Sequence, residues 1–293
     1  MNIYKYPYEK YPILHKQEVR GTEGMEVSLV DYPVNPYHTI ALGQTASYRP
    51  WKDSFTIDEM LKIIGDISSG KIWAGQCFEG INFVFKIEGI SRALTHQLVR
   101  VRVGAGMMQE SGREGTWEDC SFITPLTILE NPQAHKEYVN MMGAQIGTYS
   151  YLKEIGIPPQ DARFMFGHGV AQNMWLTINM RALMEWCSKR LCTTMQWEIN
   201  TLARMIRDSV LERFPHLGVM LKSVCEKSGG CVMEKKYRGQ ESAIYYHVGD
   251  PNNGNKVYFP LEGNICGKAG LYSEDNIQQM LDNEIETLED MPS

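Results

Sequence analysis

Helical periodicity dominates residues 56–214, and β-rich segments interrupt it at only a few places. The clearest of these segments is INFVFKI at residues 81–87, which is partly alternating and therefore predicts a strand. Strands and helices do not alternate regularly, as they would in a doubly wound parallel sheet. The pattern therefore predicts an α+β fold.

The predicted helices begin at recognisable capping residues. Thr56 is a candidate N-cap, and Glu59 three residues later completes a capping box. Ser91 is a candidate cap for a short helix that ends near Val99. The predicted helices span residues 56–69, 91–99, 133–155 and 193–214, and a further helix is predicted to begin in IPPQDARFMF, where prolines suit a first turn.

The amino-acid composition of the chain changes at two places. The first residues are rich in Tyr and Pro, and after about residue 220 Gly, Lys, Asn and Cys become frequent while helical periodicity fades. We therefore predict an N-terminal arm over 1–37, a main domain over 38–220, and a small C-terminal appendage over 221–293.

Composition and charge exclude several classes of protein. The 293 residues are 43% hydrophobic and 22% charged, which is typical of globular domains. A formal net charge of −6 argues against a general nucleic-acid binder. The start of the chain lacks the apolar core of a signal peptide, and no apolar run is long enough to span a bilayer. We expect a soluble cytoplasmic protein without nucleic-acid or membrane partners.

A loop rich in arginine and glycine, RVRVGAGMMQESGRE, follows the short helix at residues 100–114. Its glycines allow tight turns and a close approach of the backbone to a ligand. Ser111, Gly112 and Arg113 offer a hydroxyl, backbone N–H groups and a guanidinium, a set that suits a phosphate monoester. A solvated charged loop is the alternative interpretation.

A second cluster of polar residues lies within an otherwise apolar region. Residues 161–199 carry Arg163, Asn179, Arg181, Arg190 and further polar residues among apolar ones. An arginine in a buried helix is costly unless a partner neutralises it. Glu185 and Glu198 are candidate partners. Several arginines among apolar residues are nevertheless explained better by an anionic ligand than by burial in a core without water.

The two clusters, in this order, resemble those of the flavin-dependent thymidylate synthases. The family signature is R-H-R, seven or eight residues, and then S, usually continued as S-G-R. Here Arg100-Val101-Arg102 is followed by eight residues and then Ser111-Gly112-Arg113. The spacing of the second cluster also matches, and so do QTASY at 44–48 and the strand after Phe78-Glu79. The resemblance covers roughly residues 38–215.

This resemblance implies a fold, an assembly and a reaction. The fold would have a central, mostly antiparallel sheet with long helices, and the assembly would be a homotetramer with active sites at subunit junctions. Each site would hold FAD, dUMP and methylenetetrahydrofolate, with NADPH recharging the flavin and dTMP as the product. The chain would then be a methyltransferase that polarises the uracil ring electrostatically, while the flavin performs the redox chemistry.

The resemblance also implies roles for individual residues. The predicted catalytic residues are Arg190, placed against the uracil, and Ser111, for which we favour a phosphate role over a nucleophilic one. The predicted nucleotide-binding residues are Gln97, Ser111, Gly112, Arg113, Arg163 and Arg190. The predicted flavin-side residues are Ser47, Arg100, Arg102, Asn179 and Glu185.

The sequence departs from the family pattern mainly on the flavin and folate side. Val101 stands where the signature has histidine, and Glu114 stands where a tyrosine usually follows S-G-R. Upstream, where the family has H-x-[ST]-x-x-E-H, the chain reads AGQCFEG and lacks both histidines. Two alternatives therefore remain open: a repurposed homologue that hydroxymethylates dUMP or dCMP, and a non-catalytic nucleotide-binding relative.

Cysteines and histidines add few candidates. Cys225, Cys231 and Cys266 lie in the predicted appendage, where free thiols are favoured over a zinc site completed by His247. We therefore predict no metal. His96 is interpreted as a packed or capping residue, and His168, flanked by glycines, as a weak candidate near the nucleotide.

Overall fold

The computed structural model describes residues 18–46, 48–72, 75–115, 117–192, 195–228 and 274–289. The chain divides into two compact units that interleave along the sequence. The first unit comprises residues 1–26, 87–100 and 108–174, and the second comprises 27–86, 101–107 and 175–293. The division predicted at residues 37 and 220 stays a prediction.

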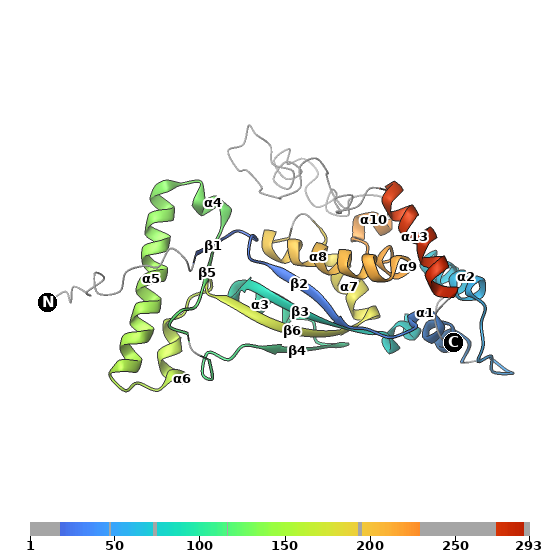
Figure 1. Cartoon of the computed structure of the whole chain (residues 1–293), viewed down its shortest axis with the longest axis horizontal. Coiled ribbons are helices and arrows are strands. Elements are labelled where there is room, and N and C mark those ends of the chain that lie inside the picture. The colour runs from blue at the N-terminus through green and yellow to red at the C-terminus, as the bar shows by residue number, and fades with distance from the viewer. Residues whose placement is uncertain are drawn as a thin grey trace. The chain divides into compact units, whose positions relative to one another are not determined.

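The strands form an antiparallel sheet and one small parallel pair, as Figure 1 shows, so the α+β prediction is confirmed. The four-stranded sheet has the order β2 (Glu26–Asp31), β3 (Asn82–Ser91), β6 (Ala171–Asn179) and β4 (Ala105–Gln109). The parallel pair is β1 (Glu18–Arg20) with β5 (Phe122–Thr124). β4 is an edge strand, and it lies inside the arginine-rich loop of the sequence.

Strand β6 is an element that the sequence patterns missed. The helix predicted from IPPQDARFMF is only one turn long, because α6 (Pro159–Ala162) passes into a 3₁₀ turn, η4 (Arg163–Met165). Buried and exposed residues then alternate from Gln172 to Ile178, the period of a half-buried strand. Arg163 is therefore half-buried in a turn and does not lie within a buried helix.

The first unit is built on the long helix α5 (Pro132–Glu154), which lies close to the predicted bounds 133–155. Asn131 caps this helix by accepting from two backbone N–H groups. Figure 1 shows α5 with α4 (Leu126–Leu129) and α6 at its two ends. The predicted apolar stripe of α5 packs into a core with residues from before and after the helix. This core includes Trp117, Phe122, Val139, Met142, Ile146, Tyr149 and Val170.

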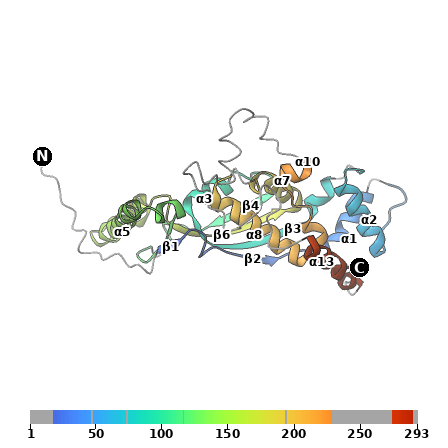
Figure 2. The same ribbon diagram turned by 90° about the horizontal axis from the view of Figure 1, so that it is seen from above.

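The second unit contains most of the remaining helices. They are α1 (Pro36–Thr45), α2 (Ile57–Ser68), η3 (Gly75–Gly80), α7 (Met180–Arg190), α8 (Trp197–Arg213), α9 (Pro215–Gly218), α10 (Val224–Ser228) and α13 (Glu274–Glu289). The capping box predicted at Thr56 and Glu59 is confirmed. Figure 2 shows α1, α2 and α13 together, and Figure 1 shows α8 between α7 and α9.

A buried carboxylate ties α13 to the rest of the second unit. Glu284 is only 6% exposed. It accepts a hydrogen bond from the Tyr37 hydroxyl of α1 and two from His216 of α9, at 3.0 Å from the backbone N–H and 2.8 Å from Nδ1. These three hydrogen bonds, from two residues, satisfy a carboxylate that would otherwise be costly to bury. Within the described residues, no helix is both long and apolar enough to cross a membrane.

Candidate functional site

The arginine-rich loop turns at Gly104 before it enters β4. Gly104 has a φ of 72°, a backbone conformation that favours glycine. Its carbonyl oxygen accepts from the Asn179 N–H at 2.8 Å, at the junction of β6 and α7. Asn179 in turn caps α7, since its side-chain oxygen accepts from the Ala182 N–H at 2.9 Å. The predicted flavin-side residue Asn179 therefore has its oxygen engaged and can offer a ligand only its N–H donors.

The arginines of the loop suit an anionic ligand. Arg100 and Arg102 are both exposed, and within the described residues neither guanidinium forms an ion pair. Two guanidiniums and an amide are donors that match a diphosphate. Val101, between the two arginines, is half-buried and offers no ring nitrogen where the family signature has histidine.

The Ser111-Gly112-Arg113 segment forms a tight turn after β4. The Ser111 carbonyl accepts from the N–H groups of Glu114 and Gly115, both at 3.2 Å, and the Ser111 hydroxyl accepts from the Arg113 N–H at 3.3 Å. Gly112 is buried, and a Cβ atom on it would lie 3.4 Å from Arg163 Cδ. The first unit thus brings together Gly112 and Arg163, two predicted nucleotide-binding residues that are distant in sequence.

The side chains of the two arginines are held differently. Arg163 Nε donates to the Gln160 carbonyl at 3.0 Å, which orients the guanidinium from within its own turn. Arg113 Nε donates to the Glu114 carboxylate at 2.6 Å, and both of these side chains are more than half exposed. An exposed ion pair of this kind is weak, so Glu114 competes with an incoming anion for Arg113 without blocking it.

Gln97 lies on α3 (Arg92–Leu98), whose first turn is anchored to the segment that follows Arg163. Ser91 caps this helix, as predicted. The first two N–H groups of α3 donate to the carbonyls of Val170 and His168, at 3.0 and 3.1 Å. Gln97 and Arg163 therefore belong to connected segments of one unit.

His168 contacts a second histidine. The His168 ring meets the His96 ring edge-on, with centroids 5.8 Å apart. Both histidines are exposed, so this contact lies at the surface and the interpretation of His96 as a packed or capping residue stays a prediction.

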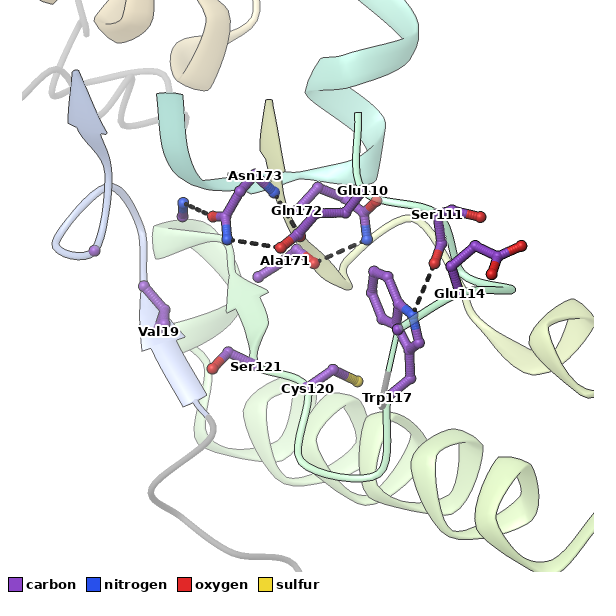
Figure 3. A pocket seen from close by; sticks show the side chains of 13 residues that line it. Val19, Glu110, Ser111, Glu114, Trp117, Cys120, Ser121, Ala171, Gln172 and Asn173 are labelled. Atoms are coloured by element: carbon purple, nitrogen blue, oxygen red, sulfur yellow. Dashed lines mark hydrogen bonds between the residues drawn. The ribbon is translucent and has the colours of Figure 1, made fainter. Parts of the chain in front are cut away.

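A cavity of about 650 Å³ opens beside Ser111 in the first unit. Figure 3 shows Glu110, Gln172 and Asn173 along one side of it, with Ser121 and Cys120 opposite. The Glu110 carboxylate is fixed, because it accepts from the Asn173 backbone N–H at 2.8 Å and from Asn173 Nδ2 at 2.9 Å. The cavity therefore carries oriented hydrogen-bonding groups next to the predicted phosphate ligand.

The indole of Trp117 and the thiol of Cys120 also line the cavity. Trp117 is buried, and its Nε1 donates to the Ser111 carbonyl at 3.2 Å. This hydrogen bond stabilises the turn at Ser111-Gly112-Arg113. Burial raises the pKa of the Cys120 thiol to about 12. This thiol is protonated near neutral pH and is therefore a poor nucleophile.

The sequence patterns missed Glu110, Trp117, Gln172 and Asn173 as site residues. The run MWLTIN over 174–179 is rich in β-forming residues and alternates between apolar and polar residues from Leu176 onward, and this was the signal that could have extended a strand back to Gln172 and Asn173. Glu110 and Trp117 carry no such signal, because their positions depend on contacts with segments about 60 residues away or on the turn itself.

Arg190 and Glu185 lie on α7 in the second unit. Arg190 is the last residue of the helix and is half-buried, with Nη1 3.6 Å from the sulfur of Met195. Glu185 is exposed and pairs with Lys189 at 2.8 Å, and this hydrogen bond lowers the pKa of the Glu185 carboxyl. Ser47 lies outside the described residues.

Several of the cysteines that were considered as zinc ligands also lie outside the described residues. Cys231, Cys266 and His247 are not among them, and neither is the side chain of Cys225. Among the described residues, no group of three or more histidine, cysteine or acidic side chains is arranged to hold a metal ion.

Comparisons with known proteins identify one family. The model of the family "Thymidylate synthase complementing protein" matches residues 28–216. The chain is 33% identical over 199 residues to the flavin-dependent thymidylate synthase of Sulfolobus acidocaldarius, which covers 66% of this chain and 75% of that protein. It is 32% identical over 200 residues to the enzyme of the same name from Pyrococcus abyssi, covering 64% and 80%.

A solved structure shares the fold. The UMP/dUMP methylase PolB from Streptomyces cacaoi, bound with 5-Br dUMP, superimposes with a TM-score of 0.60 over 70% of this chain and 96% of that one. The two sequences are 17% identical, so this likeness concerns the fold. Helix α13, with its buried Glu284, lies beyond the residues that the family model matches.

Proposed function

Because the chain belongs to the thymidylate synthase complementing protein family, we propose that it is a flavin-dependent methyltransferase that converts dUMP to dTMP. The observation that carries the nucleotide assignment is the contact between Gly112 and Arg163 beside Ser111. It brings the Arg163 side chain to the turn that carries the Ser111 hydroxyl, and a guanidinium with a hydroxyl is a donor set suited to a phosphate. Gln97 and Arg113 complete the proposed nucleotide-binding set.

In this proposal Arg190 lies against the uracil ring. A fixed cation there stabilises the negative charge that develops on the ring as C5 becomes nucleophilic. Half-burial of Arg190 supports the role, because electrostatic stabilisation is stronger where water is partly excluded. Ser111 acts on the phosphate and positions the nucleotide.

The flavin side of the proposal uses Arg100, Arg102 and Asn179, with Ser47 and Glu185 as further candidates. The arginines bind the FAD diphosphate and Asn179 donates from its amide. Bound flavin, reduced by NADPH, supplies the electrons, and methylenetetrahydrofolate supplies the carbon.

A homotetramer is part of the proposal. Val103, directly after Arg102, is 84% exposed, and Met108, in strand β4, is 75% exposed. Large apolar side chains with this exposure support a subunit contact. A second copy packed there would place additional residues next to the loop, as the resemblance implies.

A second candidate reaction is hydroxymethylation of dUMP or dCMP. Val101 favours it, because an apolar side chain replaces the signature histidine beside the proposed flavin ligands. A change confined to that side would alter the fate of the transferred carbon and leave nucleotide binding intact. A non-catalytic nucleotide-binding protein is the third candidate.

One assay separates these functions. The purified protein is reconstituted with FAD and given NADPH, methylenetetrahydrofolate and either dUMP or dCMP. We expect a yellow protein, release of the C5 proton of dUMP, and dTMP as the product by mass. A hydroxymethylated product supports the second candidate, and nucleotide binding without turnover supports the third. A colourless protein that cannot be reconstituted with FAD excludes the first.

The phosphate assignment has its own test. Arg163→Lys keeps the charge but loses the two-pronged donor, so we expect weaker binding of dUMP and unchanged binding of deoxyuridine. Arg20→Lys, at an exposed arginine of β1 in the same unit, is the matched control. Equal loss for both ligands would contradict the assignment.

A further inference from the structure

The side chain of Asn200 is fully buried on α8 and makes three hydrogen bonds. Asn200 is 0% exposed. Its Nδ2 donates to the carbonyls of Arg190 at 2.8 Å and Cys192 at 3.1 Å. Its Oδ1 accepts from Arg204 Nε at 2.9 Å, one turn further along α8. The carboxamide therefore uses both of its amide hydrogens and its oxygen inside the second unit.

One of these bonds reaches a carbonyl that a helix end leaves without an intrahelical partner. Arg190 is the last residue of α7, and the final carbonyls of a helix have no N–H ahead of them in the chain. From a neighbouring helix, Asn200 supplies a donor to the Arg190 carbonyl and a second donor to the Cys192 carbonyl, which also accepts from the Met195 N–H at 3.0 Å. The backbone that carries Arg190 is thereby tied to α8, which has eleven buried residues among its 17.

The segment after Arg190 is also held at its other end. Gln196 caps α8 by accepting from the Ile199 N–H at 3.0 Å. The Arg190 guanidinium contacts the sulfur of Met195, in the same connection. Both the backbone and the side chain of Arg190 are therefore restrained between two capped helix ends.

An apolar residue at position 200 would fill the same space without the cost of burying an amide. The amide is explained if the carbonyls of Arg190 and Cys192 must be held in one place. The oxygen of the amide is satisfied separately, because it accepts from Arg204 Nε.

We propose that Asn200 is a positioning residue for Arg190, which fixes the Cα of that arginine so that its guanidinium meets the pyrimidine ring. The catalytic part of this inference rests on the proposed function. The positional part rests on the three hydrogen bonds alone, and it can be tested without turnover.

The test compares Asn200→Asp with Arg204→Met. Asn200→Asp keeps the size of the side chain and the acceptor for Arg204 but removes both donors to the carbonyls. Arg204→Met disturbs the same buried network and leaves those donors in place. The two variants therefore separate loss of positioning from loss of packing. If Asn200→Asp does not fold, Asn200→Ala takes its place, since it removes the donors without adding charge.

The first readout is cleavage of the Arg190–Leu191 bond by trypsin in the folded full-length chain, mapped by mass spectrometry. We expect Asn200→Asp to accelerate this cleavage by roughly tenfold or more, because the turn is released, and Arg204→Met to leave it near the wild-type rate. Unchanged cleavage in Asn200→Asp would overturn the proposal, whatever the activity.

The second readout is the split between kcat and KM for dUMP. We expect kcat to fall by roughly 10- to 100-fold in Asn200→Asp, with a much smaller change in KM, because misplacement of Arg190 weakens stabilisation of the transition state. Faster cleavage with an unchanged kcat would overturn the catalytic part. If the wild-type protein binds dUMP but shows no turnover, the proposed function fails, while the cleavage result still decides the positional part.

Discussion

Gly104 and Asn179 lie so close together that a Cβ atom on Gly104 would come within 2.6 Å of Asn179 Nδ2 and 2.8 Å of its Oδ1. The same Cβ would also come within 2.9 Å of the Cβ of Ala182. Since φ at Gly104 is 72°, neither the space nor the backbone conformation suits a side chain. The start of β4 and the start of α7 are therefore locked together by a glycine.

Gly104→Ala is predicted to loosen this junction. We expect the free energy of unfolding to fall by about 1–3 kcal/mol, from the strained backbone and the displaced cap of α7. Urea denaturation measures the loss, and retention of FAD during gel filtration measures its effect on the proposed flavin side. Gly106→Ala is the matched control, because a Cβ there meets nothing within 4 Å. Equal losses for the two variants would contradict the locked junction.

Local signals in the sequence placed four of the helices, which are α2, α3, α5 and α8, but not α1, α7 or α13. Thr56 and Glu59 form the predicted capping box, and Ser91 caps α3, because capping depends on residues within one turn of the helix end. The stripe of α5 was likewise readable from its helical period. Strand β4 was not, since AGMMQ has no alternation and becomes a strand only by pairing at a sheet edge.

The candidate site likewise contains some features that local sequence predicts and others that depend on tertiary contacts. The turn at Ser111-Gly112-Arg113 could be predicted from its residue types alone. Its neighbour Arg163 was predicted through a family resemblance, and the wrong local structure was assigned to it. The bond from Trp117 to Ser111 and the lock between Gly104 and Asn179 depend on tertiary contacts that no single segment encodes.

Helix α13 is predicted to be held in place by its buried carboxylate. Tyr37→Phe removes one hydrogen bond to Glu284 and leaves the ring packing intact, so we expect a loss of about 1.5–3 kcal/mol in the free energy of unfolding, the range for bonds to charged groups. Gln278→Ala is the control, since it removes an exposed hydrogen bond to Asp282 on the same helix. Hydrogen exchange at α13 should rise in the first variant only. An unchanged exchange rate would show that other contacts hold the helix.

The stability of the first unit is predicted to depend on pH through Glu18. Burial raises the pKa of the Glu18 carboxyl, but hydrogen bonds from Thr124 and His135 outweigh this effect, so the pKa in the folded state lies below its usual value of 4.5. The stability that Glu18 contributes is therefore fully present above pH 4.5 and is lost as the pH falls through the lowered pKa.

Urea denaturation of the wild-type chain and of Glu18→Gln, repeated between about pH 6 and pH 3, measures this contribution. We expect the variant to be less stable near pH 6 and the gap to narrow toward pH 3. Glu23→Gln, at an exposed position in the turn after β1, serves as the control and should leave the pH profile as it is. A gap that stays constant over the range would contradict the role of Glu18.

Glu114 is predicted to weaken phosphate binding, because its carboxylate pairs with Arg113 in the unliganded chain. In Glu114→Gln the guanidinium no longer has to exchange one anion for another. We expect the Kd for dUMP to fall by roughly two- to fivefold, with the gain disappearing at high salt and absent for deoxyuridine. Glu130→Gln changes the net charge of the same unit equally at an exposed position after α4, and so reports the effect of charge alone. Titration calorimetry measures all three proteins, and an equal gain in Glu130→Gln would assign the effect to net charge, with no part for the contact with Arg113.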